Sequence, residues 1–145
     1  MPPILQVRDI AVEFPTREGT VNAVNGVNFN LGHGETMCLV GESGAGKSMT
    51  ALAILQLLPY PGKLVRGDVL FEGQSLCSMK ENDLRKIRGK EIALVSQDAK
   101  ASLNPIISVG TQMEEMLLAH TEMTKLEARD YSIELLHKME IPEAK

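Results

Sequence analysis

Residues 37–50 read MCLVGESGAGKSMT, an apolar run that enters a glycine-rich octet and continues into a helix-forming segment. The octet, residues 41–48, fits the pattern G-x-x-x-x-G-K-[ST], which binds phosphate where it leaves a buried strand and opens a helix. Both flanks meet that condition, because residues 37–40 are predicted as a buried strand and residues 49–58 as a helix stopped at Pro59. The octet, called the P-loop below, is predicted to hold a nucleoside triphosphate with its metal.

The four fixed positions of the P-loop are Gly41, Gly46, Lys47 and Ser48. Glycines and small residues let backbone amides approach the phosphates, Lys47 neutralises charge on the terminal phosphates, and the Ser48 hydroxyl ligates magnesium. The structural alternative is a glycine-rich turn before an ordinary core helix, with Lys47 merely solvated. The two flanks favour the phosphate loop.

Length and composition indicate about one globular domain, since the chain has 145 residues, 43% of them hydrophobic. The net charge is -4 and no Lys/Arg block stands out, which argues against nucleic acid as the main partner. Cys38 and Cys77 have no metal-ligand spacing, and Cys38 is expected in the buried strand at 37–40. No apolar run approaches the length of a bilayer, so a membrane connection is expected to go through a partner.

The remaining elements follow from periodicity and from breakers such as Gly and Pro. They predict an α/β fold whose core begins with an antiparallel strand pair before the P-loop and ends in a helical region. Thr124 is a candidate N-cap for the last helix. Strands are expected at 4–14, 21–31, 64–71 and 92–96, turns or loops at 15–20 and 97–105, and helices within 79–91 and at 109–120 and 125–139.

Three features together resemble the front half of an ABC-transporter ATP-binding subunit: the octet GESGAGKS, the antiparallel start and the segment QDAKASLNP at 97–105. The segment AVNGVNFNLGHGET at 23–36 is similar to the approach to the P-loop in one subfamily. That subfamily energises import of dipeptides and oligopeptides, and of nickel or glutathione in some members. The resemblance runs from Leu5 to Ala144 and implies a P-loop NTPase fold of the ABC type.

The resemblance also implies site residues. Phe14 occupies the position of the aromatic residue that stacks on adenine. The less favoured alternative is that Phe14 is the last core residue of an edge strand. Gln97 occupies the position of the glutamine in the Q-loop, residues 97–105, and would attend the magnesium ion or the attacking water. Lys47 and Gln97 are thus the catalytic candidates, and Ser48 and Gln97 the metal candidates. The residues expected to bind ATP are Phe14, Gly41, Glu42, Ser43, Gly44, Ala45, Gly46, Lys47, Ser48 and Met49.

The chain departs from the family pattern in two ways. It has Ala99-Lys100-Ala101 where the family usually has a proline after the acid of the Q-loop, which is expected to loosen that loop. It also ends before the family's signature, Walker B, D-loop and switch-histidine regions. Residues 1–145 are therefore expected to be an incomplete ATP-binding domain, with a core α/β portion at 1–97 and the Q-loop and first part of the helical subdomain at 98–145.

The function implied by the resemblance is the ATP-binding subunit of an ABC importer for peptides or a related small solute, using ATP and Mg²⁺. Its implied partners are integral-membrane permease subunits, a second ATP-binding subunit and, indirectly, a solute-binding protein. The implied location is cytoplasmic, on the inner face of the cell membrane through the permease. Hydrolysis is expected to need the missing regions and the second subunit, so this chain alone is expected to be inactive.

Two other hypotheses stay open at this point. A self-contained small P-loop kinase or NTPase could use Asp98, at the end of the 92–96 run, as a magnesium ligand, although no convincing strand follows it. A non-catalytic nucleotide-binding module or remnant would need only the P-loop. Since the family's central sheet takes strands from both halves, the isolated chain is expected to be poorly soluble or partly molten.

Overall fold

The computed structural model describes residues 2–98 and 101–141. The chain forms two units, Met1–Leu84 and Arg85–Lys145, each with its own internal packing. Among the described residues, no helix combines the length and the apolar character that crossing a bilayer requires.

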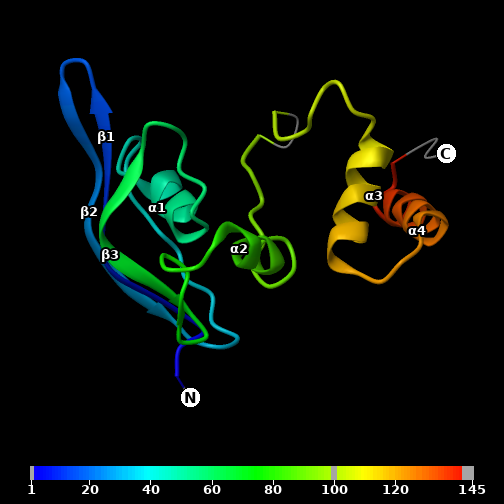
Figure 1. The fold of residues 1–145 in the computed structure, drawn as a ribbon, viewed down its shortest axis with the longest axis horizontal. Coiled ribbons are helices and arrows are strands. Elements are labelled where there is room, and N and C mark those ends of the chain that lie inside the picture. The colour runs from blue at the N-terminus through cyan, green and yellow to red at the C-terminus, as the bar shows by residue number, and fades with distance from the viewer. Residues whose placement is uncertain (1, 99–100, 142–145) are drawn as a thin grey trace. The chain divides into compact units, whose positions relative to one another are not determined.

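The first unit is built on an antiparallel sheet with the strand order β2-β1-β3-β4 (Figure 1). The predicted antiparallel start is confirmed, but its two strands extend further into the 15–20 segment than predicted, because Thr16 pairs directly with Gly19. The strands are β1 (Leu5–Thr16), β2 (Gly19–Leu31), β3 (Lys63–Phe71) and β4 (Gln74–Ser75).

The core of this unit lies between the sheet and helix α1 (Lys47–Ile54). Ile10, Val12 and Val69 from the sheet are fully buried, and Ala53 of α1 is buried as well. Burying an aliphatic side chain of this size contributes about 1.5–3 kcal/mol. The apolar contact therefore holds α1, and with it the end of the P-loop, against the sheet.

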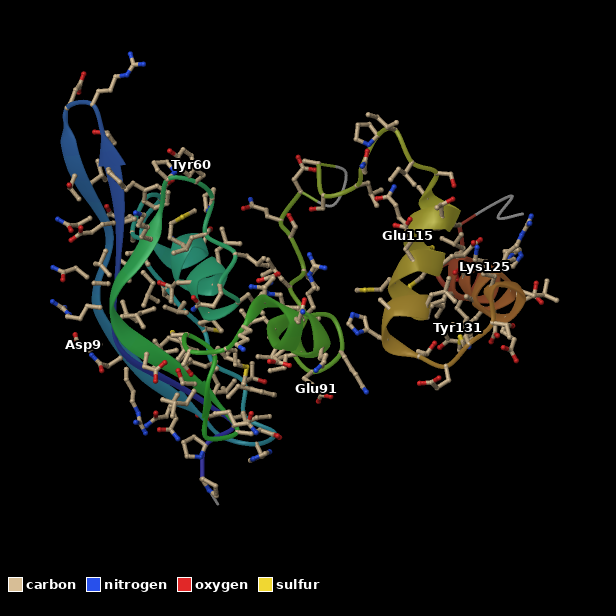
Figure 2. All side chains as sticks on the ribbon, in the orientation of Figure 1. Asp9, Tyr60, Glu91, Glu115, Lys125 and Tyr131 are labelled. Atoms are coloured by element: carbon tan, nitrogen blue, oxygen red, sulfur yellow. The ribbon has the colours of Figure 1, made fainter. Side chains whose placement is uncertain are left out.

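An ion pair lies where the register between the three long strands shifts. Arg66 of β3 contacts Asp9 of β1 at 3.0 Å, on the face of the sheet that points away from α1 (Figure 2). At this level the pairing of β1 with β2 and the pairing of β1 with β3 both have a register shift, and Gly67 has a φ of 89°. A Cβ on Gly67 would lie 2.4 Å from the Arg8 carbonyl oxygen. The backbones of β3 and β1 are therefore so close here that only glycine fits.

Helix α1 ends earlier than predicted. It stops at Ile54 because Gln56 adopts a φ of 54°, while Leu57 N–H bonds to the Leu52 carbonyl and Gln56 N–H to the Ala53 carbonyl. These two bonds form a Schellman motif, which usually uses glycine at the left-handed position. Because glutamine stands there instead, no stop signal is visible before Pro59.

The second unit contains a pair of packed helices, α3 (Val109–His120) and α4 (Lys125–Lys138), with the bounds predicted for α3. The predicted N-cap is confirmed, since Thr124 and Glu127 form a reciprocal capping box. Hydrogen bonds from the backbone and side chain of Thr124 lower the pKa of the Glu127 carboxyl. The short helix expected within 79–91 is α2 (Glu81–Ile87), which crosses the boundary between the units.

Two predicted strands do not form. Residues 37–40 and 92–96 have no ladder partner among the described residues, apart from one isolated bridge at Ile92. Apart from the half-buried Ile92 their side chains are exposed, with Val40 at 90% and Val95 at 94%. A strand needs a neighbour for its backbone hydrogen bonds, so an apolar run alone does not make one.

The prediction that Cys38 is buried is wrong for the same reason, since it lies in the unpaired segment and is exposed. Cys77 is the more enclosed cysteine, and its burial raises the pKa of the thiol. Both cysteines are free.

Candidate functional site

The P-loop turns sharply into helix α1. Gly44 and Gly46 have φ angles of 83° and 84°, a left-handed conformation that glycine adopts without a steric penalty. Within the loop Ala45 N–H bonds to the Glu42 carbonyl at 3.2 Å, and Thr50 N–H bonds to the Gly46 carbonyl at 2.8 Å. Backbone hydrogen bonds thus hold the loop together and join its last glycine to the first turn of the helix.

Gly46 is the point where the loop meets the sheet. A Cβ on Gly46 would lie 2.4 Å from the Ala23 carbonyl oxygen and 3.4 Å from Cγ2 of Val24. Both neighbours belong to β2, so the helix start lies directly against this strand. The glycine is required here both by its φ angle and by the lack of space.

The N-terminus of α1 is suited to an anion. Its N-cap is Gly46, no side chain caps it, and its first turn contains no acidic residue. The first backbone amides of a helix have no intrahelical acceptor, and the helix dipole adds partial positive charge at this end. An uncapped N-terminus behind a glycine loop therefore presents amides to phosphate oxygens.

Lys47 lies across the loop. Its Nζ donates hydrogen bonds to the carbonyl oxygens of Gly41 and Glu42, each at 2.7 Å. A lysine ammonium has three N–H donors, so this arrangement fixes the charge at the loop and leaves one donor for a ligand. The residues present therefore fit a polyphosphate.

Ser48 follows in the first turn of α1, and its side chain is exposed. A hydroxyl oxygen is the hard type of ligand that Mg²⁺ takes, and nucleotide sites commonly supply few protein ligands beside the phosphates. The other loop residues predicted to bind ATP are exposed or half-buried: Gly41, Glu42, Ser43, Gly44, Ala45 and Met49.

Phe14 lies on the same face of the sheet as α1. It is two residues after the buried Val12, and residues two apart on a strand share a face. Val12 pairs with Val24, the residue that contacts Gly46. Since a strand rises about 3.3 Å per residue, Phe14 is placed about 7 Å along β1 from the level of the helix start.

The structure brings Phe14 and the P-loop into one unit, whereas Gln97 belongs to the other. Gln97 is exposed, and its approach to Ser48 stays a prediction. The neighbouring Asp98 accepts a hydrogen bond from Ala101 N–H through Oδ1 at 3.0 Å, which gives its carboxylate a local role in the Q-loop. The departure at Ala99-Lys100-Ala101 falls mostly outside the described residues.

Gln112 is a Q-loop contact that the sequence analysis missed. Its Oε1 accepts from Asn104 N–H at 2.9 Å, and its Nε2 donates to the carbonyls of Asn104 at 3.1 Å and Ile107 at 2.8 Å. The side chain thus ties the end of the Q-loop to helix α3. The signal in the sequence that could have indicated this contact is a glutamine four residues after Ser108, the N-cap of the helix.

Replacing Gln112 by Ala is expected to speed amide exchange at Asn104, because the amide loses its acceptor. Stability should fall by no more than about 1 kcal/mol, since water can replace hydrogen bonds at a partly exposed site. Gln112→Glu retains the acceptor and should keep more of the protection. Amide exchange measured by NMR checks this, with Glu115→Ala on the exposed surface of α3 as the control; unchanged exchange at Asn104 would contradict the contact.

A glycine loop with a lysine across it, an uncapped helix and an antiparallel sheet define a nucleotide-binding protein of the P-loop class. The model of the ABC transporter family matches residues 24–145. The chain belongs to this family.

Curated relatives are similar over nearly the whole chain. The oligopeptide transport ATP-binding protein OppD of Bacillus subtilis (strain 168) is 46% identical over 96% of this chain and 39% of its own length. The dipeptide transport ATP-binding protein DppD of the same strain is 43% identical over 99% of this chain and 43% of its own length. The chain therefore spans about two fifths of the curated relatives it matches.

The fold is similar to that of a solved cassette. The ATP-binding cassette MJ0796, in a dimeric post-hydrolysis state bound to ADP and Pi, matches with a TM-score of 0.80 and 26% identity. The match covers 96% of this chain and 58% of that chain. The predicted fold class, an α/β P-loop NTPase fold of the ABC type present in part, is thus confirmed.

Proposed function

We propose that this chain is part of the ATP-binding subunit of an ABC importer for peptides or a related small solute. The observation that carries the proposal is Lys47, held by two carbonyls across a glycine loop at the uncapped N-terminus of α1. Membership of the family and the names of the curated relatives support it.

The P-loop would bind the phosphates and Phe14 would bind the base. Backbone amides of residues 43–49 would donate to phosphate oxygens, and Lys47 would neutralise their charge through charge-assisted hydrogen bonds. Phe14, on the same sheet face, would stack on adenine. The contacts between the P-loop and the phosphates would then supply most of the binding energy for ATP, and the contact between Phe14 and the base would supply less.

Ser48 and Gln97 would provide ligands to a magnesium ion. When bound, Mg²⁺ neutralises charge that develops on the phosphates during transfer. Ser48 would contribute its hydroxyl oxygen from the first turn of α1, and Gln97 its side-chain oxygen from the Q-loop. Gln97 would also orient the attacking water.

Hydrolysis would be catalysed mainly by positioning and electrostatics, as in phosphoryl transfer generally. Such a mechanism needs every charged and hydrogen-bonding group in place, and a second ATP-binding subunit is proposed to complete the site. The dimeric state of the MJ0796 cassette supports this partner. Permease subunits and, indirectly, a solute-binding protein are the other proposed partners, which would put the protein on the cytoplasmic face of the membrane.

An apolar hollow in the second unit is our candidate for the permease contact. It has a volume of about 260 Å³ and lies where the Q-loop meets the paired helices. Leu103 of the Q-loop and Gln112, which clamps that loop, both line it. An apolar permease segment seated there would touch the loop that carries Gln97. The other lining residues are Val109, Met113, Met116, Leu117 and Leu135.

Gln97→Ala tests the assigned division between binding and hydrolysis. In the full-length gene product, ATP affinity is expected to stay within about twofold, because the P-loop contacts are untouched. Hydrolysis is expected to fall by about 100-fold or more, the range seen when one transition-state contact is lost. Calorimetric titration and phosphate release measure the two effects; equal losses in affinity and rate would contradict the role of Gln97.

A further inference from the structure

Gly62 lies directly against the ring of Phe14. A Cβ on Gly62 would be 2.5 Å from both Cε1 and Cζ of Phe14, well inside van der Waals contact. Gly62 also closes the turn that leads into β3, since its N–H bonds to the Pro59 carbonyl at 2.8 Å. The exposed Tyr60 marks this turn in Figure 2.

The backbone of Gly62 does not itself demand glycine. Unlike Gly46 and Gly67, it lies outside the left-handed region of φ. An alanine could therefore adopt the same backbone conformation, and the obstacle is space alone. The glycine is needed because the aromatic ring occupies the volume that a side chain would take.

Strand pairing fixes the backbone beneath the ring. Phe14 pairs with Val21 of β2, and the preceding Glu13 pairs with Lys63 of β3. A methyl group at position 62 would therefore displace the ring before it displaces the strand, because the ring is the far end of a side chain with two torsions. The methyl group would also lie 2.9 Å from the Pro59 carbonyl oxygen, so the turn itself is crowded at this position.

We propose that Gly62 is a positioning residue that sets the orientation in which Phe14 receives the base of a nucleotide. This inference rests on the proposed function, which gives Phe14 the adenine contact. The two atoms nearest to a Cβ on Gly62 belong to the ring and the third is the Pro59 carbonyl oxygen, so none of the three belongs to the P-loop. Loss of Gly62 should therefore weaken base recognition without weakening phosphate binding.

The test compares ATP with inorganic triphosphate, which has the phosphates but no base. Titrations with the full-length gene product would include wild type, Gly62→Ala, Phe14→Leu and the double variant. We expect Gly62→Ala to weaken ATP binding about tenfold, the order of a lost base–aromatic stack, and to leave triphosphate binding unchanged. The double variant should bind ATP about as Phe14→Leu does, since the ring that the methyl group displaces is absent and only the Pro59 carbonyl remains close to it.

Gly110→Ala is the matched control. Gly110 also lies outside the left-handed region, and a Cβ there would meet nothing within 4 Å. The double variant guards against misfolding, because removing the ring makes room for the methyl group. A direct readout follows ring-labelled phenylalanine by NMR, with the Phe14 signal assigned from its absence in Phe14→Leu. That signal should shift in Gly62→Ala even without nucleotide.

The outcomes separate the inference from the proposed function. Wild-type ATP affinity in Gly62→Ala, or an equal loss of ATP and triphosphate binding, would overturn the role of Gly62. If Phe14→Leu keeps full ATP affinity, the base contact and this inference both fail while phosphate binding at the P-loop stands. If wild type binds neither ligand, the proposed function itself fails.

Discussion

Lys47→Ala is expected to abolish detectable MgATP binding. The substitution removes the one ammonium held at the P-loop, where it would neutralise the terminal phosphates. Lys47 has one donor left for a ligand, and a hydrogen bond to a charged group contributes about 1.5–3 kcal/mol, so losing it alone weakens binding by about 10- to 100-fold, and the phosphate charge that it would offset adds to the loss. Calorimetric titration of the full-length gene product measures the effect.

Two further variants make the interpretation of this result specific. Lys47→Met keeps the length of the side chain without its charge, and should lose binding as completely as the alanine variant. Lys125→Ala removes an exposed lysine at the start of α4, labelled in Figure 2, and should bind as wild type does. Retained affinity in Lys47→Ala would contradict the assignment of the loop.

Gly46→Ala is expected to lose both nucleotide binding and stability. Its φ of 84° costs an alanine about 1 kcal/mol, and the 2.4 Å approach to the Ala23 carbonyl adds about 1–3 kcal/mol of overpacking. Relief of that clash would move the helix start away from β2. The amides that face the phosphates would move with it. Thermal unfolding and ATP titration measure the two effects.

Gly34→Ala is the control that separates the cost of the left-handed backbone conformation from the cost of the close contact at Gly46. Gly34 has a φ of 70°, but a Cβ there would meet nothing within 4 Å. This control should therefore show the backbone penalty alone and keep full ATP affinity. If the two variants lose equal stability and both keep their affinity, the close contact between the loop and β2 has no functional role.

The elements that could be predicted from the sequence are those whose signals are local. Alternation predicted the hairpin of β1 and β2, and the apolar spacing with Thr124 predicted the two helices of the second unit. The P-loop was predicted because its glycines, its lysine and the helix after it lie within one short stretch, although the strand predicted before it at 37–40 does not form. Local hydrogen bonding and fixed φ angles depend on neighbouring residues, so the sequence shows them directly.

What depends on distant partners could not be predicted. The apolar runs at 37–40 and 92–96 carry the composition of buried strands, yet they are exposed because no described strand pairs with them. The clamp by Gln112 and the contact of Gly62 with Phe14 join residues separated along the chain. Glycine gives no side-chain signal, so the demand for space at Gly62 becomes visible only when β1 and β3 are paired.

Hydrogen–deuterium exchange of the full-length gene product with and without MgATP is the most direct test of the P-loop as the nucleotide site. Bound phosphates should accept hydrogen bonds from the amides of residues 43–49, and peptides covering this stretch should exchange more slowly by about tenfold or more. Protection centred there, and lost in Lys47→Ala, is the predicted result. Protection elsewhere with unchanged exchange across 43–49 would contradict the account.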